Sequence, residues 1–78
     1  MSIYDPLFRW LRAQGANQIN VSFLYLERIL GFDLPESARI DAQWWHNAPE
    51  HVQAKAWLDA GFYTEQVDLT AETLTFAR

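Results

Sequence analysis

The segment DAQWWHNAPEH, residues 41–51, places two adjacent tryptophans beside a histidine and an asparagine. In an extended segment neighbouring side chains point to opposite sides, and in a helix they diverge by about 100°. One core therefore cannot bury Trp44 and Trp45 equally. The sequence predicts that one ring packs inward and seats the helix that follows, whereas the other stays half exposed with its indole N–H near a polar partner or water.

This following helix is predicted to begin at Asn47 and to end at Gly61. Asn47 and Glu50 have the spacing of a reciprocal cap, and Pro49 is tolerated because first-turn amides lack an intrahelical partner. The inward stripe, against which the buried tryptophan would pack, is Ala54, Trp57 and Leu58. A more polar side carries His51, Lys55 and Asp59.

Two helices are expected upstream of this segment. The first has Asp5 as its N-cap, Pro6 at its first position and Gly15 as its stop. The second has Ser22 as its N-cap and Gly31 just beyond its last turn. Their apolar positions follow a helical spacing: Leu7, Phe8, Trp10 and Leu11 in the first, and Phe23, Leu26, Ile29 and Leu30 in the second.

The remaining segments predict strands and a turn. The alternation of apolar and polar residues predicts a short strand over residues 19–21, and Pro35 indicates a turn or a single helical turn over residues 34–39. Two strands joined by residues 70–72 close the chain. The expected faces are Tyr63, Glu65, Val67 and Leu69 on the first strand, and Leu74 and Phe76 on the second.

The resulting order is helix, strand, helix, turn, helix and hairpin, over one domain of residues 1–78. It predicts an α+β fold of the winged helix-turn-helix type, with three helices and the hairpin as the wing; an unrelated small α+β fold is the alternative. A chain this short has little core, so its twelve aromatic residues are expected mainly inside.

Composition limits the classes of function. The chain has no cysteine, which excludes disulfides and thiolate zinc sites. A net charge of −4 argues against binding nucleic acid through phosphates alone. No apolar run approaches the roughly 20 residues of a membrane span, and the first residues lack the basic and then apolar pattern of a secretory signal, so we expect no such signal and a cytoplasmic location.

From residue 22 onward the chain resembles a small, uncharacterised bacterial domain family. The resemblance rests on ILGF (29–32), LPESAR (34–39), WWHN (44–47), QAKAWL (53–58), AGF (60–62), VDL (67–69) and FAR (76–78). Two positions depart from the pattern: Tyr25 stands where an acidic residue is usual, and Phe62 replaces a tryptophan. The resemblance implies a shared architecture and brings no established activity.

Catalytic and metal chemistry are not expected. His46 precedes the helix and His51 lies inside its first turn, which is not the i, i+4 pair on one helix face that zinc hydrolases use. Glu50 is expected to cap and Asp41 to be solvated. There is no nucleophile with a suitably spaced base and no glycine-rich phosphate loop, so the sequence predicts a protein that is not an enzyme and needs no cofactor.

The winged-helix interpretation predicts a nucleic-acid-binding surface, in a regulatory or defence-related setting. The early residues of a recognition helix meet base edges, and nearby cations meet phosphates. The candidate binding residues are Arg39, Trp45, His46, Asn47, His51 and Lys55. The predicted wing carries three acidic residues and no Lys or Arg, so a monomer would bind DNA weakly; forming a homodimer would relieve this.

The alternative is an acidic protein-interaction module. An acidic wing suits a basic partner, and winged helices often dock proteins. One version of this hypothesis is a phage or mobile-element inhibitor that covers a basic nucleic-acid-binding surface. The sequence leaves nucleic acid and protein as nearly equal candidates for the partner.

Overall fold

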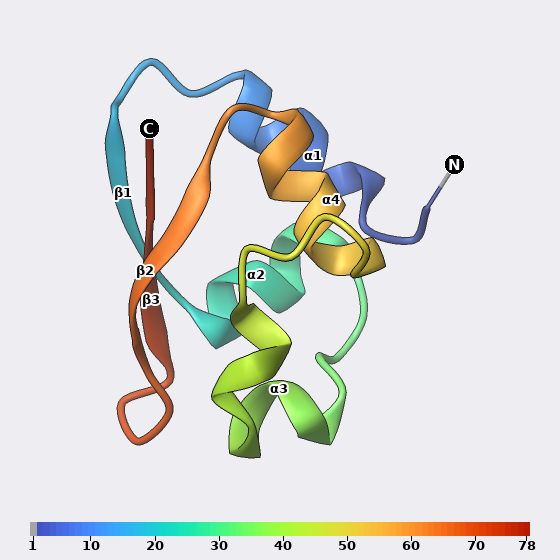
Figure 1. Ribbon diagram of the computed structural model, residues 1–78, viewed down its shortest axis with the longest axis vertical. Helices are drawn as coiled ribbons and strands as arrows, with labels where there is room; N and C mark the ends of the chain where they lie inside the picture. The colour runs from blue at the N-terminus through green and yellow to red at the C-terminus, as the bar shows by residue number, and fades with distance from the viewer. Residues whose placement is uncertain (1) are drawn as a thin grey trace.

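The computed structural model describes residues 2–78, which form four α-helices, one 3₁₀ turn and three strands (Figure 1). In chain order these are α1 (Asp5–Arg12), β1 (Gln18–Ser22), α2 (Phe23–Leu30), α3 (Glu36–Ile40), η1 (Ala42–Trp45), α4 (Val52–Asp59), β2 (Tyr63–Asp68) and β3 (Thr73–Ala77). The predicted α+β class is confirmed, with α3 as a helix in addition to the three expected.

Helix α2 begins and ends as predicted. The Ser22 hydroxyl accepts a hydrogen bond from the Tyr25 amide at 3.0 Å, and Gly31 closes the helix with a φ of 83°. A left-handed φ of this kind suits glycine, which has no Cβ to clash. The cap and the glycine stop each act within one turn of the end of the helix, so their effect does not depend on distant residues.

Helix α1 differs from the prediction at both ends. Its N-cap is Tyr4, and Asp5 is the first helical residue, with its amide bonded to the Ser2 carbonyl at 3.0 Å. The helix already ends at Arg12, so Gly15 is not its stop. Leu7 and Leu11 are buried as expected.

Helix α4 begins later than predicted. Its first residue is Val52 and its N-cap is His51, so Asn47 does not open it and the reciprocal cap with Glu50 is wrong. The physical reason is that the Asn47 side chain is bound elsewhere, to β2. The tryptophan pair instead occupies η1, where the Asp41 carboxylate caps the turn by accepting the Gln43 amide at 2.9 Å.

The sheet is antiparallel, with β3 in the centre and the order β1-β3-β2. Leu74 and Phe76 share the buried face of β3, as predicted. The single face predicted for β2 is wrong, because a bulge between Glu65 and Asp68 shifts the alternation. Tyr63 is therefore exposed, whereas Val67 packs against the core.

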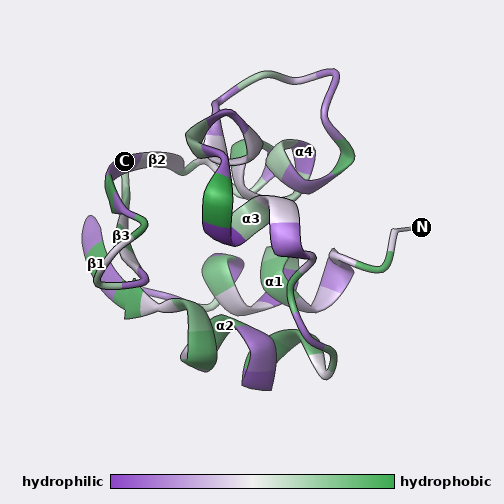
Figure 2. Ribbon diagram, turned by 90° about the horizontal axis from the view of Figure 1, so that it is seen from below, coloured by the Kyte–Doolittle hydropathy of each residue, from purple (hydrophilic) through white to green (hydrophobic). Residues whose placement is uncertain are grey.

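The core lies between the helices and the sheet and has an aromatic centre. Trp45 stacks between Phe23 and Trp57, with ring centroids 4.8 Å and 6.1 Å apart. Hydrophobic and hydrophilic stretches alternate along α1 and α2 in Figure 2, as expected for helices that bury one side. The inward-facing tryptophan is thus Trp45, and it seats α4 through Trp57.

Candidate interaction site around helix α4

Asn47 joins the loop before α4 to strand β2. Its Oδ1 accepts hydrogen bonds from the Trp57 indole at 2.9 Å and the Thr64 amide at 2.8 Å, and it lies 3.1 Å from the Thr64 hydroxyl oxygen. Its Nδ2 donates to the Thr64 carbonyl at 3.1 Å. Both ends of this amide are therefore used inside the protein, which leaves Asn47 little capacity to read a base.

The backbone of the tryptophan pair is held by two residues that sequence reasoning missed. The Thr64 hydroxyl donates to the Trp45 carbonyl at 2.6 Å, and Gln53 Nε2 donates to the Trp44 carbonyl at 3.0 Å. Neither polar residue carries a sequence signal, because each contact spans an irregular loop. Together they fix η1 against both β2 and α4.

Trp45 does not belong to a binding surface, although it was a candidate. Only 2% of its surface is exposed, and its indole N–H donates to the Ala38 carbonyl at 2.7 Å. Trp44 is the partly exposed ring of the pair, and it packs edge-on against Tyr4 at 6.1 Å.

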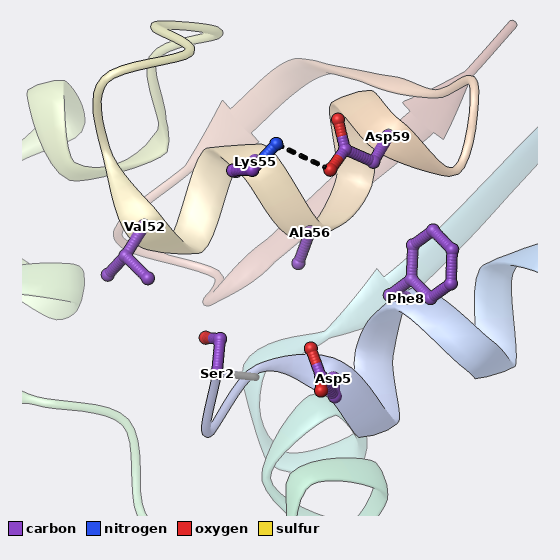
Figure 3. Close-up of a pocket in the computed structure, with 7 residues that line it drawn as sticks. All are labelled: Ser2, Asp5, Phe8, Val52, Lys55, Ala56 and Asp59. Atoms are coloured by element: carbon purple, nitrogen blue, oxygen red, sulfur yellow. Dashed lines mark hydrogen bonds and ion pairs between the residues drawn. The ribbon is translucent and has the colours of Figure 1, made fainter.

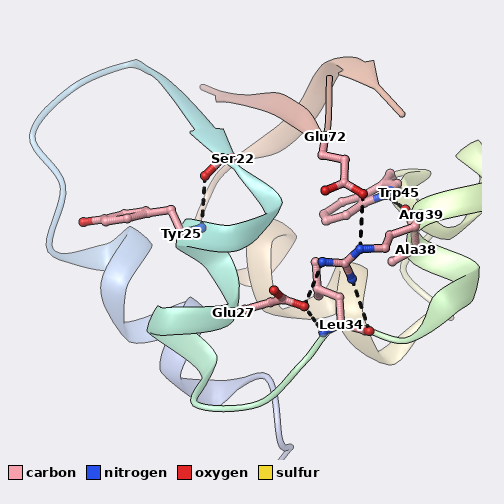
Figure 4. Close-up of polar contacts among 8 residues, drawn as sticks. All are labelled: Ser22, Tyr25, Glu27, Leu34, Ala38, Arg39, Trp45 and Glu72. Carbon is pink, nitrogen blue, oxygen red and sulfur yellow. Dashed lines mark hydrogen bonds and ion pairs between the residues drawn. The ribbon is translucent and has the colours of Figure 1, made fainter. Parts of the chain in front are cut away.

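Arg39 lies between two carboxylates (Figure 4). Its guanidinium contacts Glu27 at 3.0 Å and Glu72 at 3.2 Å, and it donates to the Leu34 carbonyl at 3.4 Å. The hydrogen bond to Glu27 raises the pKa of Arg39 further above its ordinary value, so this cation keeps its charge. Its charge serves to join α2, α3 and the hairpin loop.

Glu27 is the centre of this network. The same carboxylate accepts the Leu34 amide at 2.7 Å, and its side chain is only 11% exposed. We expect Glu27→Ala to lower the free energy of unfolding by about 1–3 kcal/mol, because hydrogen bonds to a charged group contribute that much and both donors lose their acceptor. Urea denaturation followed by circular dichroism measures the change.

Glu36→Ala is the matched control, because Glu36 is an exposed carboxylate near the same loop with no hydrogen bond or ion pair within residues 2–78. It should change the free energy of unfolding by less than about 0.5 kcal/mol. Equal losses in the two variants would contradict a specific role for Glu27.

The other candidates lie at or near the start of α4 and do not form one cationic patch. Lys55 pairs with Asp59 at 2.8 Å on the exposed side of the helix. His46 is exposed, whereas His51 is half-buried, and its Nδ1 has no hydrogen-bond partner within the described residues. These residues are close in sequence, but they do not form a surface of unpaired cations, because Lys55 is bonded to Asp59 and His51 is half-buried.

A shallow groove of about 350 Å³ separates α4 from α1 (Figure 3). Phe8 of α1 and Ala56 of α4 point into the space between the helices, and the exposed Val52 stands at one end. The full lining is Ser2, Asp5, Phe8, Val52, Lys55, Ala56 and Asp59. Because Lys55 is already paired with Asp59, Asp5 gives the lining residues a net negative charge, and the nearby Arg12 guanidinium lies over the Phe8 ring, 5.8 Å from its centroid.

Residues 2–78 contain no group of three or more His, Cys, Asp or Glu side chains placed to hold a metal ion. None of the helices in this range has the length and apolar character needed to cross a membrane.

Comparison with known proteins bears on the family alone. Neither the search of curated proteins nor that of solved structures returned a match. A family model described as a domain of unknown function (DUF7662) matches residues 4–78, a range that includes every helix and strand described above. The expected membership in an uncharacterised small domain family is confirmed, and it extends N-terminal to residue 22. The chain belongs to this family, DUF7662.

Proposed function

We propose that the protein is an acidic, non-enzymatic protein-interaction module that docks on a basic partner through the groove between α1 and α4. The observation that carries this proposal is the lining of the groove, where the exposed Val52 stands at one end and, with Lys55 paired to Asp59, the carboxylate of Asp5 leaves a net negative charge. Such a surface suits an apolar anchor with a cation next to it.

The winged-helix architecture is part of the same proposal. The helices and strands follow the order expected for that fold, with β3 between β1 and β2, α3 and η1 inserted before α4, and the β2–β3 hairpin in the place of the wing. In this assignment α4 occupies the position of the recognition helix. Winged helices bind both DNA and protein partners, so the fold alone does not indicate the class of partner, and the surface side chains have to be compared.

Those side chains favour a protein partner over nucleic acid. Phosphate binding needs unpaired Lys or Arg side chains, which neutralise phosphates and so displace the counterions condensed on the nucleic acid. Arg39 and Lys55 are each paired with carboxylates within the protein, and Asn47 spends its amide on Thr64 and Trp57. The net charge of −4 adds a repulsion from DNA at long range.

An NMR titration with a basic amphipathic peptide, with leucines at helical spacing and lysines elsewhere, tests this proposal. The peptide should shift the amide resonances of Phe8, Val52 and Ala56. Val52→Ala should weaken binding about tenfold, because removing an apolar contact of that size costs about 1.5 kcal/mol without changing the charge of the groove. Ile40→Ala is the control: Ile40 is 71% exposed but lies on α3, outside the groove, so this variant should bind normally.

Fluorescence anisotropy with a mixed-sequence DNA duplex distinguishes the alternative. We expect no binding at low salt. Binding that weakens both with added salt and in Lys55→Glu would assign α4 to nucleic acid and overturn the protein-interaction proposal.

A further inference from the structure

A second groove, of about 430 Å³, follows strand β1, which forms one edge of the sheet (Figure 1). Successive side chains of a strand point to opposite faces, so the four consecutive strand residues that line this groove can do so only along the open edge. Its other side is the aromatic pair Trp10–Tyr25, with ring centroids 5.8 Å apart. All six lining residues are uncharged: Trp10, Ile19, Asn20, Val21, Ser22 and Tyr25.

The backbone of β1 directs hydrogen-bonding groups toward the open edge. At the two ends of the strand the Arg78 amide donates to the Asn17 carbonyl at 2.9 Å, and the Phe23 amide donates to the Glu72 carbonyl at 2.8 Å. Bonded and unbonded pairs alternate along an antiparallel ladder, and the register between these ends is unbroken. The middle residue of the strand, Asn20, therefore points its N–H and C=O away from β3, toward the open edge.

The two edges of the sheet differ in their protection. Natural proteins discourage pairing at a free edge with charged side chains, proline or a bulge. Strand β2 has a bulge, with Gln66 at a φ of 53°, and the charged residues Glu65 and Asp68. Strand β1 is regular over Gln18–Ser22 and contains neither a charge nor a proline. It is therefore the edge on which an additional strand fits.

Charge indicates which strand pairs there. Residues 13–26, which include β1 and its flanks, contain no Asp, Glu, Lys, Arg or His and are the longest uncharged stretch of the chain. Two copies with a net charge of −4 each repel one another over most surfaces, but opposing β1 strands bring no like charges into contact. The uncharged groove likewise gives a charged peptide nothing to pair with. A neutral strand is complementary to this edge, and residues 18–22 of a second copy are such a strand.

The order of side chains along β1 is also self-complementary. Antiparallel pairing about a two-fold axis through Asn20 places Gln18 opposite Ser22 of the second copy. It also places Ile19 opposite Val21 of the second copy. Residues directly opposite each other share a face of the sheet, so polar groups meet on the outer face and branched aliphatic groups meet on the core face.

The second copy completes the groove. Ile19 is only half-buried in the single chain, and in the pair it enters the groove beside Trp10 and Tyr25 of the other copy. Leu24 and Tyr25 are 60% and 47% exposed at the start of α2, directly after β1, and pairing covers part of this surface. Each copy thus supplies an apolar side chain that the groove of the other lacks.

We propose that β1 pairs with β1 of a second copy and joins two three-stranded sheets into one of six strands. The bulge at the β2 edge stops further addition, so the assembly closes as a dimer with two-fold symmetry. The dimer carries two copies of the α1–α4 groove, but its formation does not depend on the function proposed for that groove. Since only five residues of each strand pair, we expect a dissociation constant of about 10–500 µM.

Sedimentation velocity between about 10 µM and about 1 mM tests the dimer. We expect the weight-average mass to rise from that of one chain toward that of two. Over the same range, ¹⁵N spectra should show concentration-dependent shifts and slower hydrogen exchange at the amides of Gln18 and Asn20. The amide of Val52, in the α1–α4 groove, should not change.

Charged variants at the two-fold axis test the register. Asn20→Lys and Asn20→Asp each place two like charges opposite one another, so each alone should raise the dissociation constant about fivefold. An equimolar mixture should dimerise about as well as the unmodified protein, because opposite charges then meet. Both variants lose the same side-chain bonds to Leu74 and Thr75, so the mixture isolates the effect of charge. Gln66→Lys makes the same change from amide to ammonium on the other edge strand and should leave the dimer unchanged.

Four results would overturn the proposal. A chain that stays monomeric at about 1 mM, with unprotected amides at Gln18 and Asn20, would leave the edge to a different protein. Equal effects of Asn20→Lys and Gln66→Lys would show that β1 is not the contact. A mixture that dimerises no better than either variant alone would contradict the register. Self-association with shifts at Val52 in place of Gln18 and Asn20 would assign the contact to the α1–α4 groove.

Discussion

Trp45→Ala is expected to unfold the domain, or to leave it folded only in part at room temperature. The substitution removes a ring stacked between Phe23 and Trp57 and the indole donor to Ala38. Truncating a buried tryptophan costs about 3–5 kcal/mol. At about 0.05–0.15 kcal/mol per residue, a domain of this length has roughly 4–12 kcal/mol of stability in total. Urea denaturation followed by far-ultraviolet circular dichroism measures the loss.

Trp44→Ala is the matched control, because it removes the same side chain from the adjacent position. Trp44 is only partly buried and contacts Tyr4 and Trp45 edge-on. Its loss should lower the free energy of unfolding by less than half as much. If both variants lose equal stability, the two rings share the core and the assignment of Trp45 as the inward ring is wrong.

Asn47→Ala is expected to be the second most damaging single substitution. It leaves the Trp57 indole and the Thr64 amide without their acceptor and the Thr64 carbonyl without its side-chain donor. Each such unsatisfied group costs about 1–3 kcal/mol when buried. Because Asn47 lies at the surface and water replaces part of the loss, we expect a total of about 2–4 kcal/mol. Thermal and urea denaturation give the change in stability, and the indole N–H resonance of Trp57 reports the broken contact directly.

Asn47→Ser distinguishes this role from that of a helix cap. Serine caps helices about as well as asparagine, so a capping residue would tolerate the change. Its side chain is too short to replace an amide that spans from the loop to Thr64 and Trp57, so we expect Ser to resemble Ala here. Asn47→Asp keeps an acceptor for the Trp57 indole and the Thr64 amide but loses the donor to the Thr64 carbonyl, so its stability should lie between that of the wild type and that of the alanine variant. Full stability of the serine variant would restore the cap interpretation.

The ends of helix α2 and the presence of one inward tryptophan could be predicted from the sequence. Ser22 and Gly31 were predictable because a cap and a left-handed stop depend on residues within one or two helical turns. The adjacency of Trp44 and Trp45 predicts that one ring points into the core, but it does not indicate which of the two. The choice is made by the geometry of η1, which aims Trp45 at Phe23 and Trp57.

The missed features depend on distant partners. Asparagine is a common N-cap residue, but the side-chain oxygen of Asn47 accepts a hydrogen bond from the Thr64 amide, 17 residues further along the chain. Glu27 and Arg39 meet only after α3 has brought them together across 12 residues. The bulge at Gln66 has no glycine to mark it, so a strict alternation assigned the wrong face to β2. Each of these depends on tertiary contacts that local spacing does not encode.

The placement of the tryptophans gives the protein two separate optical reporters without any label. Trp45 and Trp57 stack in the centre, with Trp44 against Trp45, so excitation energy passes among the three and their emission follows the integrity of the core. Trp10 stands apart: it packs edge-on against Tyr25 in a groove of about 430 Å³ along strand β1, and its emission responds to what enters that groove. Replacing Trp10 by phenylalanine therefore separates a folding signal from a ligand signal in one steady-state spectrum.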